Sequence, residues 1–285
     1  MSYTASGSLW FTIDAELGIP HSLITVDHLI SGEFTQYNVL VLPGAWGNSL
    51  GQRLGEAGKA NISEWIQDGG TLVTMGSSAV WAADTATGLS QVRIKRQVLD
   101  KLDHYDTWLA REIAAESPVV DTMAVWHPDK VPAEDGGEEE EPKRPGLQAA
   151  EELDKWQRRF FPRGVILRSQ VDTEHWLAFG MDAQMPIGLY TTHAFMAAEP
   201  VKAVARLSPE QDNLRMSGLL WPEARQRWAG TAVLTRERMG NGQIIMFATQ
   251  PYFRAYWRGT WQPFMNAILY GPGFTRSLKP YEQQR

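Results

Sequence analysis

The sequence predicts an α/β protein in which helices cover both faces of a mostly parallel sheet, with an α+β insertion in the middle of the chain. Strand-like and helix-like segments alternate in residues 1–84 and again in residues 230–285, as expected of parallel strands joined by crossover helices. Turn residues directly follow two apolar strands, and open α/β sheets place their ligand crevices at such carboxyl ends. The chain has 285 residues, of which 43% are hydrophobic, so it is long enough to bury a large core.

The N-terminal half of the domain, residues 1–84, alternates between helices and strands. Apolar residues recur at helical spacing in three segments, of which the second is broken by glycine: 8–17, 50–67 and 78–83. Short apolar runs bounded by turn residues predict three strands: 22–26, 39–42 and 71–75. Pro43, Gly44 and Gly76 then lie at the carboxyl ends of the last two strands.

Residues 85–229 interrupt this alternation and are predicted to fold as an insertion or cap. Helices are expected over residues 92–115 and 149–160, and strands over 165–171, 187–190 and 202–205. Residues 133–146 are acidic and rich in Gly and Pro, so we expect a solvated, mobile loop there.

The C-terminal half of the domain, residues 230–285, begins with two strands. They are expected over residues 232–236 and 243–247, and the pair Asn241-Gly242 between them is a strong hairpin signal. Gln250, Pro251 and Tyr252 follow the second strand and precede a predicted final helix.

Three motifs occur in a characteristic order. Residues 39–45 (Val-Leu-Val-Leu-Pro-Gly-Ala) form a strand and a tight turn, residues 69–80 form a strand, a sharp elbow and a helix, and residues 246–252 (Met-Phe-Ala-Thr-Gln-Pro-Tyr) end the last strand. Together they resemble class I glutamine amidotransferases, which have a flavodoxin-like sheet. The resemblance implies that the turn at Gly44 and Ala45 supplies an oxyanion-hole amide.

The same resemblance implies that the catalytic triad has been lost. Ser78 stands at the nucleophile position, Gln250 at the position of the general base, and Tyr252 at that of the carboxylate that orients the base. The chain contains no cysteine, whereas glutaminase chemistry uses a thiolate. A serine hydroxyl needs an adjacent base, and glutamine is not one. We therefore expect no glutamine hydrolysis; a serine hydrolase that uses Ser78 with an unconventional base is one alternative.

Further segments resemble the amidotransferase-like domain at the C-terminal end of large bacterial proteins of the M14 zinc carboxypeptidase family. They occur in the same order over residues 7–11, 17–20, 161–168, 175–180, 253–260 and 266–272. The resemblance implies a non-catalytic companion domain that serves interdomain packing or substrate presentation in a periplasmic or extracellular protein. It also implies that zinc belongs to an upstream peptidase domain of the same polypeptide, and that this chain has no cofactor of its own.

A flavodoxin-like sheet normally has a central strand before its first helix, and residues 1–6 are too short and polar to supply one. Without that strand, its two neighbours would keep unpaired backbone groups. We therefore expect that the sheet lacks its first strand and that the chain is a fragment in which Met1 is not the natural start. No signal peptide is visible, so the signal of an exported parent would lie upstream.

Composition excludes several other functions. The net charge of −6 argues against a dedicated nucleic-acid binder, and no apolar run is long enough to span a membrane. The six histidines form no His-x-x-Glu pair, so no metal site is expected. Asp172, Glu174 and His175 are the densest set of possible ligands, but their spacing suits a turn.

The predicted crevice offers another alternative, in which the chain is a stand-alone module that binds a carbohydrate or a peptide. Candidate residues at the strand ends are Gly44, Ala45, Trp46, Gly76 and Ser77, beside Ser78 and Gln250. Twelve tryptophans are many for this length, and aromatic faces give contact area at low entropic cost, although packing is their commoner role. Arg254 and Arg258 would suit a bidentate carboxylate clamp, but such arginines more often pair with acids or stack on rings.

Overall fold

The computed structural model describes residues 2–45, 49–95 and 160–276, which belong to one compact unit. The predicted acidic loop 133–146, almost all of the predicted helices 92–115 and 149–160, and Trp46 lie outside these residues. At the described start of the predicted helix 92–115, Arg93 and Ile94 instead form a short strand.

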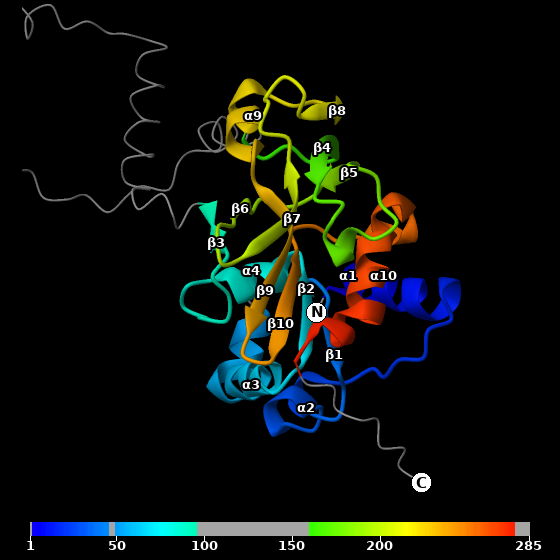
Figure 1. The fold of residues 1–285 in the computed structure, drawn as a ribbon, viewed down its shortest axis with the longest axis vertical. Coiled ribbons are helices and arrows are strands. Elements are labelled where there is room, and N and C mark those ends of the chain that lie inside the picture. Colours follow the sequence, from blue (N-terminus) through cyan, green and yellow to red (C-terminus); the bar gives the residue numbers. More distant parts are fainter. Residues whose placement is uncertain (1, 46–48, 96–159, 277–285) are drawn as a thin grey trace, which may run out of the picture. The chain divides into compact units, whose positions relative to one another are not determined.

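The described strands form one mixed ten-stranded sheet (Figure 1). They are β1 (Val39–Leu42), β2 (Thr71–Met75), β3 (Arg93–Ile94), β4 (Val165–Val171), β5 (Gln184–Leu189), β6 (Phe195–Met196), β7 (Lys202–Leu207), β8 (Arg215–Ser217), β9 (Ala232–Met239) and β10 (Gly242–Phe247). The main order is β1-β2-β10-β9-β7-β4-β5, while β3 pairs with β6, β6 with β9, and β8 with β4. Parallel pairing joins β1, β2 and β10, and the other pairs are antiparallel.

Helices lie on both sides of the parallel strands in Figure 1, with α3 and α4 on one side and α1 and α10 on the other. The α-helices are α1 (Tyr3–Trp10), α2 (Val26–Ser31), α3 (Ser49–Gln67), α4 (Ser77–Ala83), α9 (Pro222–Trp228) and α10 (Trp261–Tyr270). Shorter helical segments are the π-helix η1 (Phe11–Glu16) and the 3₁₀ turns η3 (Trp176–Ala178), η4 (Phe253–Ala255), η5 (Arg258–Thr260) and η6 (Gly271–Phe274). The predicted α/β class, with helices on both faces, is confirmed, and the predicted break in the second helix lies at Gly55.

The expected unpaired neighbours of a missing central strand are not found. β1 pairs directly with β2 in parallel register, from Val39 opposite Thr71 to Leu42 opposite Thr74. β2 in turn pairs with β10, so both of its edges are hydrogen-bonded. The expectation of unpaired backbone groups was wrong because β1 and β2 pair directly with each other, so no gap for a central strand is left between them.

The predicted strand 22–26 is also wrong. Thr25 is the N-cap of α2, and its hydroxyl lies 2.7 Å from Nδ1 of His28 in a capping box. A capped helix start therefore replaces the strand, because the side chain of Thr25 satisfies backbone donors of the first turn.

The strands of the predicted insertion share a sheet with the C-terminal half. β7 pairs with β9, and β4 pairs with both β7 and β5. The β9–β10 hairpin is present, with Met239 opposite Gly242. Across residues 2–45, 49–95 and 160–276, none of the helices combines the length and the apolar character needed to cross a membrane.

Candidate functional site

The three predicted motifs meet at one edge of the sheet, because the carboxyl ends of parallel neighbouring strands lie side by side. Gly44 follows β1, Gly76 follows β2, and Gln250 follows β10. A Cβ atom on Gly44 would lie 3.1 Å from Nε2 of Gln250 and 3.5 Å from Oγ of Ser77. A Cβ atom on Gly76 would lie 4.0 Å from Cγ of Gln250. The turn, the elbow and the third motif are thus neighbours in the structure.

The elbow after β2 depends on the backbone of Gly76. Its φ of 57° and ψ of −123° lie in a region that residues with a Cβ atom rarely adopt. The N–H group of Gly76 donates to the carbonyl oxygen of Phe247 at 3.0 Å, which ties the elbow to the end of β10. The elbow is therefore retained, although the residue that it presents has changed.

Ser78 is fully buried, and its hydroxyl is occupied by backbone groups. Its Oγ accepts the N–H of Met75 at 3.0 Å, and its proton can be donated to the carbonyl oxygen of Leu42 at 2.5 Å or of Met75 at 2.9 Å. The side chain has no exposed surface. In this position Ser78 joins the ends of β1 and β2 and lacks the access to substrate that a nucleophile needs.

The predicted oxyanion-hole amide is also occupied. The N–H of Ala45 donates to Oγ of Ser77 at 2.7 Å, and the Ser77 hydroxyl donates to the carbonyl oxygen of Ala45 at 2.6 Å. Both backbone groups of Ala45 are thus satisfied by one side chain. An amide that is bonded in this way is not available to a developing oxyanion.

Tyr252 lies in the core, and within the described part of the chain it makes no hydrogen bond to Gln250. Its hydroxyl donates to Sδ of Met75, and its ring packs edge-on against Phe264 with centroids 5.4 Å apart. Burial raises the pKa of the Tyr252 phenol well above its ordinary value, so the group stays neutral. Neither Tyr252 nor Gln250 carries the charge that a general base and its orienting carboxylate would supply.

The two arginine candidates make local contacts. Arg258 donates to a carboxylate oxygen of Glu16 at 2.8 Å and lies 5.3 Å from the ring centre of Trp261. Arg254 lies 5.2 Å from the ring centre of Phe253, and its φ of 52° is left-handed. The commoner alternative, pairing with acids or stacking on rings, therefore describes both residues.

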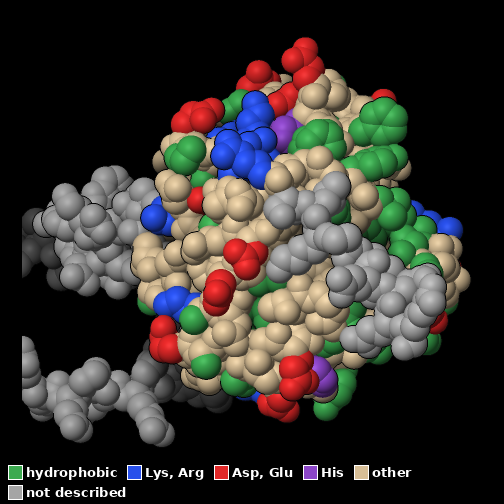
Figure 2. Space-filling model, turned by 60° about the horizontal axis from the view of Figure 1, so that its bottom comes forward, with side chains coloured by type: hydrophobic (Ala, Val, Ile, Leu, Met, Phe, Trp, Pro, Cys, Tyr) green, Lys and Arg blue, Asp and Glu red, His purple; other side chains and the backbone are tan. Residues whose placement is uncertain are grey.

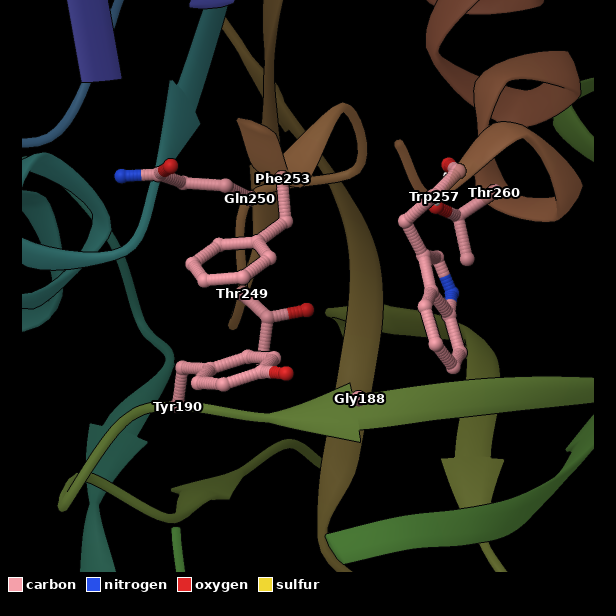
Figure 3. A pocket seen from close by; sticks show the side chains of 7 residues that line it. All are labelled: Gly188, Tyr190, Thr249, Gln250, Phe253, Trp257 and Thr260. Atoms are coloured by element: carbon pink, nitrogen blue, oxygen red, sulfur yellow. Dashed lines mark hydrogen bonds between the residues drawn. The ribbon is translucent and has the colours of Figure 1, made fainter. Parts of the chain in front are cut away.

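Beside these turns lies a small hollow with aromatic walls (Figure 3). Its lining comes from β5, the turn after β10 and the segments η4 and η5: Gly188, Tyr190, Thr249, Gln250, Phe253, Trp257 and Thr260. The rings of Tyr190 and Phe253 are stacked at 3.9 Å on one side, and Trp257 stands on the other. The amide of Gln250 points away from the hollow, toward the Gly44 and Gly76 turns.

Gly188 forms the floor between the two aromatic walls. A Cβ atom there would lie 3.1 Å from Cε2 of Tyr190 and 3.8 Å from Cε2 of Trp257. The Thr249 hydroxyl points into the space between these rings in Figure 3. Nε1 of Trp257 is buried and has no hydrogen-bond partner within the described part of the chain. Counted with the open solvent in it, the hollow measures about 200 Å³.

The sequence indicates only part of this lining. Gln250 was expected at a strand end, whereas Gly188 lies in β5 and Tyr190 directly follows it, and β5 is distant in sequence and in strand order. No local motif marks either residue, since their position depends on how β4 and β5 join the sheet.

The turn after β4 carries the predicted cluster of possible metal ligands. The N–H of His175 donates to the carbonyl oxygen of Asp172 at 3.1 Å, and the Asp172 carboxylate pairs with Lys202 at 2.9 Å. Residues 2–45, 49–95 and 160–276 contain no group of three His, Asp or Glu side chains arranged to hold a metal ion. The turn that the spacing predicted is therefore present.

Comparisons with known proteins find likeness in structure only. No protein-family model and no curated protein sequence matches the chain. A cytoplasmic protein from Salmonella typhimurium is 10% identical with a TM-score of 0.48, and the match covers 93% of this chain and 86% of that chain. A protein from Bacteroides uniformis, provisionally described as ThuA-like, is 12% identical with a TM-score of 0.46, covering 97% and 86%. A protein from Thermoplasma acidophilum, provisionally described as a GMP synthase subunit, is 11% identical with a TM-score of 0.45, covering 92% and 86%.

Proposed function

We propose that this chain is a catalytically silent amidotransferase-like domain that binds a carbohydrate or a peptide through the aromatic hollow. The observation that carries the proposal is the contrast between two neighbouring places. The hydroxyl of Ser78 is buried and fully bonded, while the adjoining hollow has aromatic walls formed by Tyr190, Phe253 and Trp257. The hollow therefore offers groups that suit binding, whereas the buried Ser78 hydroxyl does not suit acyl transfer.

The chemistry of the hollow suits one flat or ring-shaped group. The apolar face of a sugar ring, or an aromatic or proline side chain of a peptide, would pack between Tyr190 and Trp257. The Thr249 hydroxyl, which points into the hollow, offers a polar contact to such a group. Because the volume of about 200 Å³ includes open solvent, the hollow is shallow, so a ring would rest on its aromatic walls and most of the ligand would stay outside.

The expected affinity is low. A ring of about twelve heavy atoms at about 0.3 kcal/mol each contributes about 4 kcal/mol, which corresponds to a Kd of about 1 mM. Saturation-transfer NMR detects binding of this strength. Two probes are tested in separate titrations, a chito-oligosaccharide and a short proline- and tyrosine-containing peptide.

Gly188→Ala provides the decisive variant, because its methyl group would fill the floor of the hollow. Gly188 lies in a strand without a left-handed φ, so alanine suits its backbone. Gly7→Ala in α1 is the matched control, since a Cβ atom there meets nothing within 4 Å. We expect one of the probes to bind, Gly188→Ala to weaken it about tenfold, and Gly7→Ala to leave it unchanged. Binding that Gly188→Ala does not weaken, or no binding of either probe, would contradict the proposal.

We further propose, from the resemblance of the sequence, that the domain accompanies an exported M14-type zinc carboxypeptidase. The zinc would belong to the peptidase domain and not to this chain. Intact-mass measurement of the native product, with N-terminal peptide mapping, tests this role. A mass far above 32.0 kDa with an upstream His-x-x-Glu segment is expected, whereas a native product of 32.0 kDa would favour the stand-alone binding module.

A further inference from the structure

Two arginines of β9 project from the same face of the sheet near the β9–β10 hairpin. Arg236 and Arg238 are two residues apart, so their side chains point to the same side. Arg236 lies opposite Lys202 of β7, and Arg238 lies opposite Gln243 of β10. This place is at the start of β10, whereas the aromatic hollow lies beyond its end. Figure 2 shows charges of both signs on one face of the molecule, with one group of Lys and Arg side chains beside a His.

The guanidinium of Arg236 is oriented by two hydrogen bonds, one of them to a buried side chain. Its Nε donates to Oε1 of Gln243 at 2.9 Å, and its Nη2 donates to the carbonyl oxygen of Phe274 at 3.4 Å. Gln243 is fully buried, and its own Nε2 donates to the carbonyl oxygen of Gly271 at 2.7 Å and to Oγ1 of Thr71 at 3.3 Å. These contacts use two of the five N–H groups of the guanidinium. The remaining ones are oriented in advance for a ligand.

The positive charge at this place is not balanced by the protein groups around it. Neither Arg236 nor Arg238 belongs to an ion pair among the described residues. Arg236 and Arg238 lie on the same face of β9, and burial, followed by the charge of Arg238, lowers the pKa of Arg236. Of the neighbouring acids, Asp172 pairs with Lys202, and Glu237 accepts a hydrogen bond from Ser90 on the opposite face.

His175 lies near Arg236, because the adjacent Trp176 stacks on Phe274, whose carbonyl oxygen accepts a hydrogen bond from Arg236. Its Nδ1 accepts the backbone N–H of Leu177 at 3.2 Å, which assigns the ring proton to Nε2. Burial, and then the charge of Arg236, lower the pKa of His175 to about 4, so the ring is neutral near pH 7. The charges of Asp172, which raises the pKa, and Lys202, which lowers it, also act on this ring.

We propose that Arg236 and Arg238, together with the Nε2–H of His175, bind a phosphate group of a small ligand. A guanidinium with a fixed orientation matches the oxygens of a phosphate in two parallel hydrogen bonds. Two uncompensated positive charges match a phosphate dianion better than a carboxylate. Binding would also relieve the repulsion between the two arginines. The site is independent of the aromatic hollow.

Titration of the whole chain with inorganic phosphate at constant ionic strength tests the site, with NMR of the His175 ring as the readout. The signal is assigned by its loss in His175→Gln. We expect a saturable shift of the ring protons and a higher pKa for His175 when phosphate is bound, because an anion favours the charged ring. Arg238→Gln should weaken binding about tenfold, since a charge-assisted hydrogen bond contributes about 1.5 kcal/mol.

Arg215→Gln is the matched control, because it removes an equal charge from exposed β8. It should leave phosphate binding unchanged, as should Gly188→Ala in the aromatic hollow. The absence of a saturable shift would overturn the proposal, and so would an equal loss of affinity in Arg215→Gln, which would indicate general charge attraction. Acetate binding as tightly as phosphate would overturn the choice of phosphate.

Discussion

Replacing Ser78 distinguishes a structural hydroxyl from a nucleophile. Ser78→Ala removes the group that accepts the buried N–H of Met75 and bonds the end of β1. Leaving such a donor unsatisfied lowers the free energy of unfolding by about 2 kcal/mol. Alanine forms helices better than serine, so the substitution also stabilises α4 by about 0.5 kcal/mol. The net loss of about 1.5 kcal/mol corresponds to a fall in Tm of about 3–6 °C for a chain of this size.

The assay is thermal unfolding, with Ser8→Ala as the control. The Ser8 hydroxyl is exposed and bonds only the carbonyl oxygen of Thr4 within α1, so its removal should change Tm by about 1 °C or less. If Ser78→Ala is as stable as Ser8→Ala, the hydroxyl does not join the strands as described.

A second substitution measures access to the same position. The chain contains no cysteine, so Ser78→Cys would supply its single thiol. A fully buried thiol reacts with a disulfide reagent only when the structure opens, and burial also raises its pKa. We expect labelling far slower than that of exposed Ser22→Cys, and equal rates once both proteins are unfolded. Equally fast labelling of the two folded proteins, or reaction of Ser78 in the natural chain with a fluorophosphonate probe, would refute the reasoning.

Three further predictions concern other parts of the structure. Gly242→Ala should lower the free energy of unfolding by about 3 kcal/mol or prevent folding, because its Cβ atom would overlap the carbonyl oxygens of Ile66 and Gly70. Urea denaturation measures this free energy, with Gly7→Ala as the control. Tyr252→Phe should change the free energy of unfolding by less than about 1 kcal/mol in the same assay, because the hydrogen bond that it removes goes to the weakly accepting sulfur of Met75. A larger loss would show that the phenol has another role. The pKa of His175 is about 4 in the folded protein and about 6.5 in the unfolded chain, so the unfolded chain binds more protons between these two pH values. The contribution of His175 to stability is therefore lost as the pH falls from about 6.5 to about 4. An NMR titration of the folded protein with a midpoint near 6.5 would contradict this.

The sequence predicted the parallel part of the fold well because its signals are local. Residues 39–42 and 71–75 are apolar runs ended by turn residues, and both form strands within these bounds. Gly76 marked the elbow, since a tight turn from strand to helix favours glycine. The same kind of local pattern led to a wrong prediction for residues 22–26. A strand was expected there, but Thr25 caps a helix that begins at Val26.

The candidate site could be predicted only in part. The motifs placed Gly44, Gly76 and Gln250 at one edge of the sheet, which the parallel register of β1, β2 and β10 confirms. They did not indicate that Ser77 would occupy the amide of Ala45 or that Ser78 would bond Leu42. Such contacts cross more than thirty residues of chain and depend on side-chain rotamers that only packing selects.

The sequence by itself determined the residue types: no thiol, no base at position 250, and a strand, turn and elbow in amidotransferase order. The tertiary structure alone decided which residues became neighbours. It joined β5 to the sheet so that Gly188 and Tyr190 line a hollow with Trp257, and it set Lys202 of β7 opposite Arg236 of β9. The physical reason is that hydrogen-bonded strand pairing and burial act between segments far apart in the chain, where no local pattern records the partner.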